Sequence, residues 1–209
     1  MPLLLLRTVR NDGTPLSEDA ARTGFKWPVG PDAVGQTVTA PDWDPNKECG
    51  GGLHGLLWGQ GDFLLLNQVD DNLEWQVVEV APGSPVVDLG GKVKTQSVII
   101  RFSGPDPIEA CAFLKAHTPK GIVSSFDAVG DGGCAEAGDR GYVSVGVGGK
   151  GKVGRNGVLT FTDSKGDMHN STTGFRPNVY YKWDEGQKKP VAVEEANFFL
   201  RVWRTITVR

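Results

Sequence analysis

The sequence has few cysteines, no long hydrophobic run and no marked excess of charge of one sign. Its three cysteines, Cys49, Cys111 and Cys134, are odd in number and irregularly spaced, which favours reduced thiols in the cytoplasm over a disulfide framework. The apolar run Leu3–Leu6 is too short for a membrane span or for the core of a signal peptide, so we expect no targeting to a membrane or for export. The formal net charge of −3 gives no general attraction to nucleic acid, and we do not expect nucleic acid as a partner.

What the chain does have is a glycine-rich repeat. Between Ala128 and Leu159 an eight-residue unit occurs four times, as AVGDGGCA, EAGDRGYV, SVGVGGKG and KVGRNGVL. Glycine occupies the third and sixth places of every copy, at Gly130, Gly133, Gly138, Gly141, Gly146, Gly149, Gly154 and Gly157. Glycines at fixed spacing indicate backbone positions that need positive φ or a close approach of another group.

The residues that join consecutive copies predict very short strands. In Ala135–Ala137, Val143–Val145 and Gly151–Val153 the outer residues are small or apolar and the central residue is polar, as expected where the outer side chains face a core. The strict period favours a narrow β-roll in which two octads form one coil, and an antiparallel meander with Gly-rich hairpins is the alternative. Two coils bury too little apolar surface to fold alone, so we expect flanking modules or further copies of the chain to cap them.

The sequence on either side of the repeat predicts a mainly β protein of the β-rich α+β class. We expect strands at Leu3–Val9, Gln36–Ala40, Trp75–Ala81, Lys92–Phe102, Val158–Thr162, Val179–Trp183 and Asn197–Val208. One helix is expected over residues 106–117, because Asp106 can cap it, Pro107 suits its first turn and Glu109 completes a capping-box pattern. We divide the chain into an N-terminal β-rich module (1–120), the octapeptide roll (121–159) and a C-terminal antiparallel β cap (160–209).

Several segments outside the repeat carry a family resemblance. They are Val34–Ala40, Cys49–His54 (CGGGLH), Trp75–Val80 (WQVVEV), Asp88–Lys94 (DLGGKVK) and Gly174–Trp183, which contains PNVYYKW. Together with the octads they resemble phage-associated, prophage-associated and other bacterial proteins of unknown function, in which Gly-rich octapeptide repeats separate an N-terminal and a C-terminal module. This resemblance implies phage or prophage ancestry rather than a particular reaction. The octads are also similar to the left-handed parallel β-roll in the heads of trimeric autotransporter adhesins, which would imply a homotrimer.

The Gly-rich segment Cys49–Asp62 holds the residues most worth weighing as a chemical site. A pair of Cys49 and His54 could form a thiolate nucleophile, but no orienting carboxylate is identifiable. A zinc site would need two further ligands, and neither Cys111 nor Cys134 lies at finger-like spacing. We therefore favour a structural loop in which the histidine satisfies backbone groups.

An alternating acidic segment just upstream raises the question of calcium. It is formed by Asp42, Asp44, Asn46 and Glu48. An EF-hand loop starts in the same way, but it requires glycine and glutamate where this chain has Lys47 and Leu53. A solvated acidic turn is the better interpretation, and we expect neither a metal nor a cofactor.

The favoured function is that of a structural or protein-interaction protein without catalytic activity. It would bind protein partners and form a homo-oligomer through the roll and the C-terminal cap, in the host cytoplasm or in the virion. The contact surface would include His54 and the aromatic residues Trp43, Trp58, Trp183 and Trp203. Virion accessory protein and inhibitor of a host defence complex fit this hypothesis equally well.

The alternative function is enzymatic. An arginine in the first strand, a Gly-Leu-His segment and a later W-x-V-V-E-V strand resemble the layout of small ADP-ribosyltransferases, which bind NAD in the cleft of a split β-sheet. That resemblance would imply that Arg7 or His54 anchors the dinucleotide. It would also imply that Glu79 stabilises the oxocarbenium-like transition state through its charge.

Overall fold

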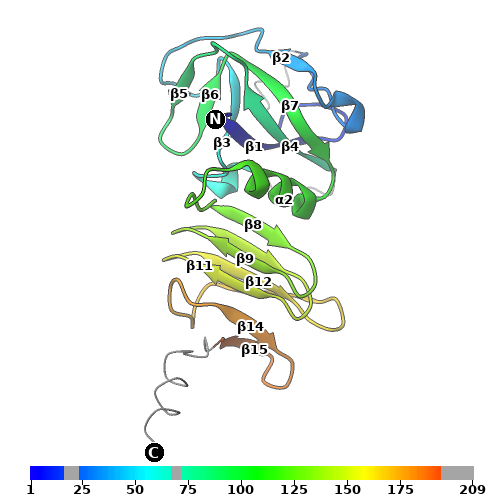
Figure 1. Cartoon of the computed structure of the whole chain (residues 1–209), viewed down its shortest axis with the longest axis vertical. Coiled ribbons are helices and arrows are strands. Elements are labelled where there is room, and N and C mark those ends of the chain that lie inside the picture. The colour runs from blue at the N-terminus through cyan, green and yellow to red at the C-terminus, as the bar shows by residue number, and fades with distance from the viewer. Residues whose placement is uncertain (17–23, 67–71, 194–209) are drawn as a thin grey trace, which may run out of the picture.

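The computed structural model describes residues 1–16, 24–66 and 72–193. These residues form an elongated molecule with a β-sheet at one end, helix α2 (Pro107–His117) across the middle and a two-sheeted roll at the other end (Figure 1). The protein is mainly β, as the sequence predicts. The predicted strand Asn197–Val208, which contains Trp203, lies outside the described residues.

Among the described residues the N-terminal sheet has seven antiparallel strands in the order β2-β7-β4-β1-β3-β6-β5. They are β2 (Thr37–Thr39), β7 (Ser97–Gly104), β4 (Leu73–Val80), β1 (Leu4–Arg10), β3 (Leu53–Leu57), β6 (Val93–Thr95) and β5 (Val86–Asp88). Strands β1 and β4 are neighbours in the middle of the sheet and are buried along most of their length, because apolar clusters cover both faces of the sheet.

Each face of this sheet packs against its own apolar cluster. Leu5 and Val9 of β1 lie in a cluster with Trp27, whereas Leu4 and Leu6 lie in a cluster with α2. This division follows from strand geometry, because successive side chains point to opposite faces. The short helices η1 (Pro31–Ala33) and η2 (Phe63–Leu66) add one buried residue to each cluster.

Helix α2 starts and ends where the sequence predicts. The Asp106 carboxylate accepts a hydrogen bond from the backbone N–H of Ile108 at 2.8 Å, and the following proline occupies the first turn. Ala110 and Leu114 are buried against the sheet and the roll. After His117 the helix stops, because Thr118 precedes a proline and has the extended conformation that proline favours in its neighbour.

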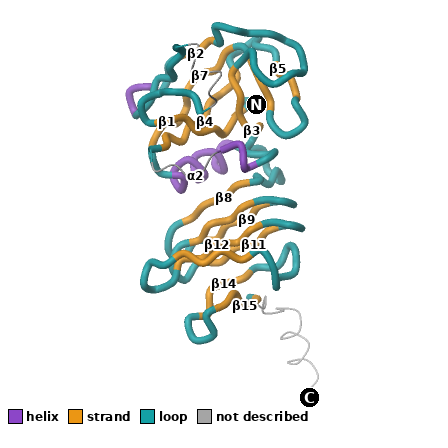
Figure 2. The backbone as a smooth tube through the Cα atoms, turned by 180° about the vertical axis from the view of Figure 1, so that it is seen from behind, coloured by secondary structure: helices purple, strands orange, loops and turns teal. Residues whose placement is uncertain are grey.

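The octads form a parallel β-roll, so the meander alternative is wrong. Strands β8 (Phe126–Val129), β10 (Tyr142–Val145) and β12 (Val158–Thr162) are parallel neighbours in one sheet, and β9 (Cys134–Ala137) and β11 (Lys150–Val153) are parallel neighbours in the other. The side chain of Asp131 binds a backbone N–H 16 residues further on, at Val147, so one coil comprises two octads. Figure 2 shows these strands stacked below α2.

The predicted alternation of inward and outward residues is also confirmed. Val143 and Val145 have no exposed surface, and Ser144 between them is partly exposed. The third strand triplet has Gly151 at an inward place, where a Cβ atom would lie 2.9 Å from Cγ1 of Val143. Small residues on this side let the two sheets approach each other.

Two further β-elements extend the sheets of the roll at its C-terminal end. Strand β13 (Met168–Ser171) pairs antiparallel with β12. Strands β14 (Tyr181–Asp184) and β15 (Lys189–Ala192) form a hairpin, and β14 pairs with β11. The core between the sheets therefore runs from Ala135 to Tyr181.

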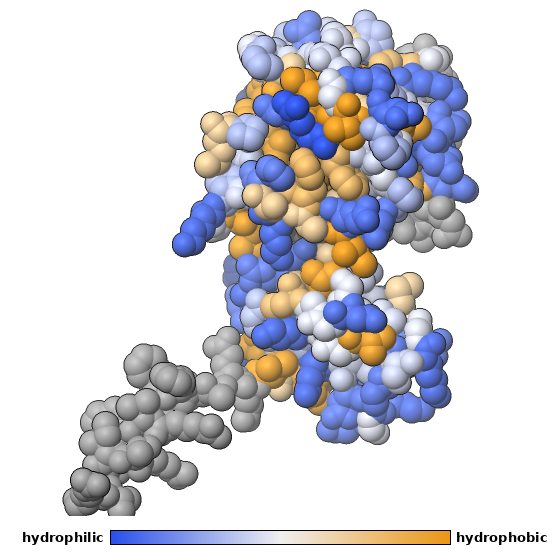
Figure 3. All heavy atoms as spheres, turned by 45° about the vertical axis from the view of Figure 1, so that its right-hand side comes forward, coloured by the Kyte–Doolittle hydropathy of each residue, from blue (hydrophilic) through white to orange (hydrophobic). Residues whose placement is uncertain are grey.

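The N-terminal sheet, α2 and the first coil share one core. The ring of Phe126 in β8 stacks on Trp75 of β4 with centroids 4.9 Å apart, and Ala128 lies in the same cluster. The backbone carbonyl of Gly59 accepts hydrogen bonds from the N–H and the hydroxyl of Ser125, both at 2.8 Å. Figure 3 shows that the surface narrows at this level and that apolar side chains reach it there. The expected boundary near residue 120 thus separates two architectures that are packed on each other.

Two expectations about local structure are wrong. The single strand expected at Lys92–Phe102 is divided into β6 and β7, which pair with different neighbours on either side of the exposed residue Gln96. The segment Cys49–Asp62, expected to be a loop, contains strand β3, whose residues Leu53 and Leu56 are buried. Apolar side chains between the glycines decide this, because burying them against β1 outweighs the low strand propensity of glycine.

Candidate functional site

A cavity lies where β1 and β3 separate. The two strands pair only at Leu5 with Leu57 and at Leu6 with Leu56. Beyond these pairs β3 follows β6, whereas β1 continues beside β4. The opening has a volume of about 400 Å³, which falls in the range of small-molecule sites.

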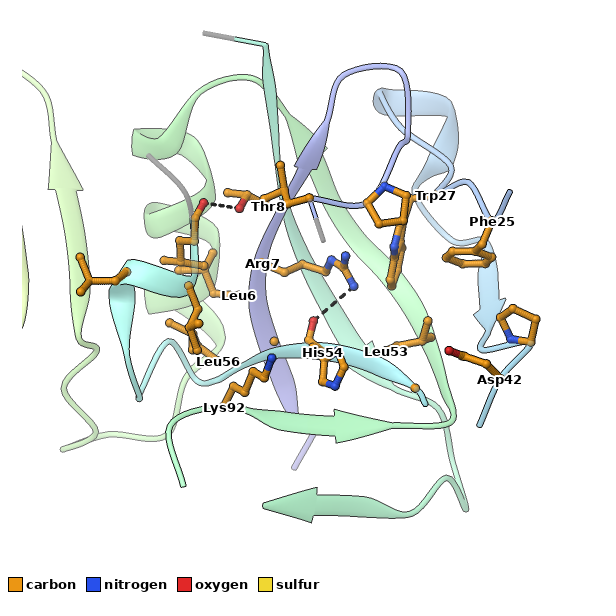
Figure 4. Close-up of a pocket in the computed structure, with 18 residues that line it drawn as sticks. Leu6, Arg7, Thr8, Phe25, Trp27, Asp42, Leu53, His54, Leu56 and Lys92 are labelled. Carbon is orange, nitrogen blue, oxygen red and sulfur yellow. Dashed lines mark hydrogen bonds between the residues drawn. The ribbon is translucent and has the colours of Figure 1, made fainter. Parts of the chain in front are cut away.

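Arg7 bridges this opening. Its side chain leaves β1 and lies between Trp27 and the backbone carbonyl of His54 (Figure 4). The Nη1 atom donates to that carbonyl at 3.2 Å, and the guanidinium carbon lies 3.4 Å from the centroid of the indole ring. A side chain thus replaces the missing ladder of backbone hydrogen bonds between β1 and β3.

The charge of Arg7 has no carboxylate partner among the described residues. Its Nε atom is buried without a hydrogen bond, and no ion pair joins the guanidinium to an acidic side chain. Burial lowers the pKa of Arg7 to about 9, because a low-dielectric surrounding disfavours the charged form. The side chain is still protonated at neutral pH, so the cavity holds a positive charge in its wall.

Two further basic side chains line the cavity. Burial, and then the charges of Lys92 and Arg7, lower the pKa of His54 to about 4, so the imidazole is neutral at neutral pH. Its Nε2 atom is buried without a hydrogen-bond partner. Lys92 lies at the same wall, and its ammonium group donates to Sγ of Cys49 at 3.1 Å.

Most of the remaining lining residues are apolar, while polar atoms form about half of the accessible surface of the cavity. The apolar lining residues are Leu6, Pro15, Leu16, Phe25, Trp27, Pro41, Leu53, Leu56, Leu64, Leu65 and Leu66. Leu64 and Leu65 are exposed, with 72% and 47% of their surface accessible. The acidic lining residue is Asp42, which is itself exposed.

No protein-family model, curated protein or solved structure matches the chain. The family resemblances inferred from the motifs therefore stay predictions. Within the described ranges no helix is long and apolar enough to cross a membrane.

Of the residues of the enzymatic alternative, Arg7 and His54 come together and Glu79 does not. Glu79 lies opposite Leu4 in the register of β1 and β4, on the face that α2 covers. Arg7 stacks on Trp27, which belongs to the cluster on the other face. Since cross-strand neighbours share a face, the arginine and the glutamate point to opposite sides of the sheet. Glu79 instead forms an ion pair with Arg101 at 2.7 Å.

Three of the four tryptophans expected to form a contact surface, Trp43, Trp58 and Trp183, are half-buried, and Trp203 lies outside the described residues. Trp43 packs on the cluster around Trp27, and Trp58 packs on the cluster under α2. The ring of Trp183 stacks on His169 with centroids 4.1 Å apart. Their main contribution is to packing, as is common for this residue type.

The three cysteines are free, as the sequence predicts. Cys49 and Cys134 are exposed, whereas Cys111 is buried in α2. Burial raises the pKa of Cys111 to about 12, so its thiol stays protonated and unreactive at neutral pH. In the described part of the chain no group of three potential ligands could hold a metal ion.

The end of the roll presents a second feature of functional interest, the outer edge of β13. This strand is the last of its sheet among the described residues. The backbone N–H of Asp163 donates to the carbonyl of Asp167, and hydrogen-bonded pairs alternate along an antiparallel ladder. Met168 and Asn170 are therefore at non-hydrogen-bonded positions, so their backbone N–H and C=O groups face the outer edge.

Strand β15, at the edge of the other sheet, is less suited to pairing. The backbone N–H of Val193 donates to the carbonyl of Tyr180, which by the same alternation directs Pro190 and Ala192 outward. Proline has no N–H to donate, and prolines and lysines on edge strands are common protection against pairing. Lys189 adds a charge to this edge.

Proposed function

We propose that the protein is a non-catalytic structural and interaction protein that self-associates through the edge of β13. The observation that carries this proposal is the row of outward backbone groups at Met168 and Asn170 on a strand with no outer neighbour among the described residues. An unpaired edge of this kind is a template for a strand of another chain. A short roll also gains stability when further strands are added at its end.

A second copy of the chain is the partner that this edge fits. Strand β13 has the sequence MHNS and carries no lysine, arginine or carboxylate. Two copies related by a two-fold axis can therefore pair β13 with β13 without placing like charges opposite each other. The N-terminal modules would lie at the far ends of such a dimer.

The phage or prophage ancestry implied by the motifs fits this role. We infer that the protein acts in the host cytoplasm or as part of the virion, and that its assembled form is what binds a protein partner. The three free cysteines support a reducing compartment. The roll then serves as a rigid stem that carries the N-terminal module.

The test is the mass of the protein in solution. Sedimentation equilibrium at tens of micromolar should give a dimer for the natural sequence, and a strict monomer would refute the proposal. A trimer, which the adhesin resemblance implies, would contradict the two-fold pairing of β13.

A matched pair of variants locates the interface. Asn170→Pro removes one outward N–H and should give a monomer, whereas Asn170→Ala should remain dimeric. Both variants lose the same side-chain hydrogen bond, which Oγ1 of Thr160 donates to Oδ1 of Asn170, so a difference between them reports on the backbone edge. Equal association of both variants would place the interface elsewhere.

A further inference from the structure

Arg7 is a charge that the described residues do not neutralise with a carboxylate. A cation removed from water is unfavourable unless an anion or several acceptors compensate it. Among the described residues Arg7 has the carbonyl of His54 and the ring of Trp27, and its Nε atom has no partner. At least one donor of the guanidinium, the N–H at Nε, thus has no acceptor among the described residues.

The shape of the guanidinium favours one kind of anion. One face of the group lies against the indole of Trp27, so its in-plane edge is what can meet a ligand. An arginine edge presents parallel N–H groups that match the two oxygens of a carboxylate. The formally charged residues of the lining are Arg7, Lys92 and Asp42, so their net charge of about +1 matches a single negative charge on the ligand.

The apolar lining determines the rest of the ligand. The wall next to Arg7 is built from leucine, proline and aromatic side chains, and the exposed Leu64 and Leu65 continue it to the surface. A ligand that filled this volume with hydrocarbon would bury apolar surface of its own and of the cavity wall. A small inorganic anion would leave that lining uncovered.

We propose that the cavity between β1 and β3 binds a small carboxylic acid with an apolar body, with the carboxylate on Arg7 and the body against the leucine-rich wall. This binding site is independent of the self-association at β13, because it lies in the N-terminal sheet, which the roll separates from that edge (Figure 1).

Calorimetric titration of the natural protein with octanoate tests the proposal. Octanoate should bind, and octanamide, which has the same chain and no charge, should bind at least about tenfold more weakly, as expected for the loss of charge-assisted hydrogen bonds. Inorganic phosphate should not bind measurably. Equal binding of octanoate and octanamide, or no binding of octanoate, would overturn the proposal. Phosphate binding without octanoate binding would mean a different anion site.

Substitutions then locate the site. Arg7→Gln should weaken octanoate binding by about tenfold or more, and Arg101→Gln, which removes the same charge from the same sheet at an exposed ion pair, should leave it unchanged. If Arg7→Gln does not fold, the comparison of octanoate with octanamide on the natural protein still decides the matter, since it needs no variant. Unchanged binding in a folded Arg7→Gln variant would contradict the assignment.

Discussion

The ammonium nitrogen of Lys94 lies 3.0 Å from the carbonyl oxygen of Gly50, and the lysine side chain has no exposed surface. The same nitrogen donates to the carbonyl of Glu48 at 2.9 Å and to Oδ1 of Asn46 at 3.0 Å. Three acceptors from one loop thus satisfy a buried ammonium group, which has three donors to offer. The alternating acidic segment that raised the question of calcium is folded around a cation of the chain itself.

We expect Lys94→Met to lower the free energy of unfolding by about 2–4 kcal/mol, because it leaves carbonyl oxygens buried without a donor. Urea denaturation followed by fluorescence measures this change. Lys47→Met, which removes a charge from an exposed side chain of the same loop, should change stability by less than about 0.5 kcal/mol. Similar losses for the two variants would contradict the role assigned to the buried ammonium.

The two faces of β10 should respond in opposite ways to a new carboxylate. Val145→Asp places a charge between the two sheets, where the native side chain has no exposed surface, and should destabilise the protein by more than about 4 kcal/mol. Ser144→Asp places the same charge on the partly exposed side and should be nearly neutral. Thermal unfolding monitored by circular dichroism distinguishes them, and equal effects would argue against the alternation.

Glycines at the same place of the octad should differ in how they tolerate a methyl group. At Gly154 a Cβ atom would lie 2.4 Å from the backbone nitrogen of Asp139 in the preceding coil, whereas at Gly138 nothing lies within 4 Å. Gly154→Ala should therefore lose about 1–3 kcal/mol of stability from overpacking, and Gly138→Ala should lose little. Chemical denaturation of both variants measures the difference.

Gly59 contacts Ser124 where the N-terminal module packs on the roll, so we expect a substitution at Gly59 to destabilise the protein. Gly59 has a φ of +72°, and a Cβ atom there would lie 2.2 Å from Oγ of Ser124. Gly59→Ala should combine the strain of positive φ with this clash and lose about 2–4 kcal/mol. Gly83→Ala is the control, since its φ of +80° is similar and nothing lies within 4 Å. It should lose only the strain, about 1–2 kcal/mol.

Acid should weaken the turn between β12 and β13. The side-chain hydrogen bond from His169, followed by those from the backbone N–H groups of Lys165 and Asp167, lowers the pKa of Asp163. A carboxyl group whose pKa is lower in the folded state stabilises the fold above its unfolded pKa of about 3.9, and this contribution is lost as the pH falls through the folded value. The melting temperature should therefore fall between about pH 5 and pH 2.

The Asp163→Asn variant provides the control for this pH dependence. It should melt at a lower temperature than the natural protein at neutral pH and should show a smaller decrease on acidification. An identical decrease in both proteins would assign the acid sensitivity to other carboxylates.

Much of the fold could be predicted because it depends on local patterns. The period of the octads places Val143 and Val145 inside the roll and Ser144 outside, and the cap of α2 at Asp106 is readable from the residues around it. The division of β6 from β7 could not be predicted, because no glycine or proline separates the two strands in the sequence and only their different partners distinguish them. Arg7 stood out as a charge in an apolar strand, but its neighbours come from segments far away in sequence.

The octads show most clearly which features the sequence determines and which depend on the tertiary structure. The sequence by itself determined that glycine recurs at the third and sixth places of each unit. Only the tertiary structure decided between positive φ and close approach as the reason. Positive φ occurs at the fifth place of each unit, in Gly132, Arg140, Gly148 and Asn156. Close approach explains the sixth glycine of every unit and the third glycine of the second coil: Gly146 meets Asp131 of the preceding coil, and Gly157 meets Val153 across its own turn. The distances between coils depend on how the coils stack, and this stacking cannot be read from the sequence of a single octad.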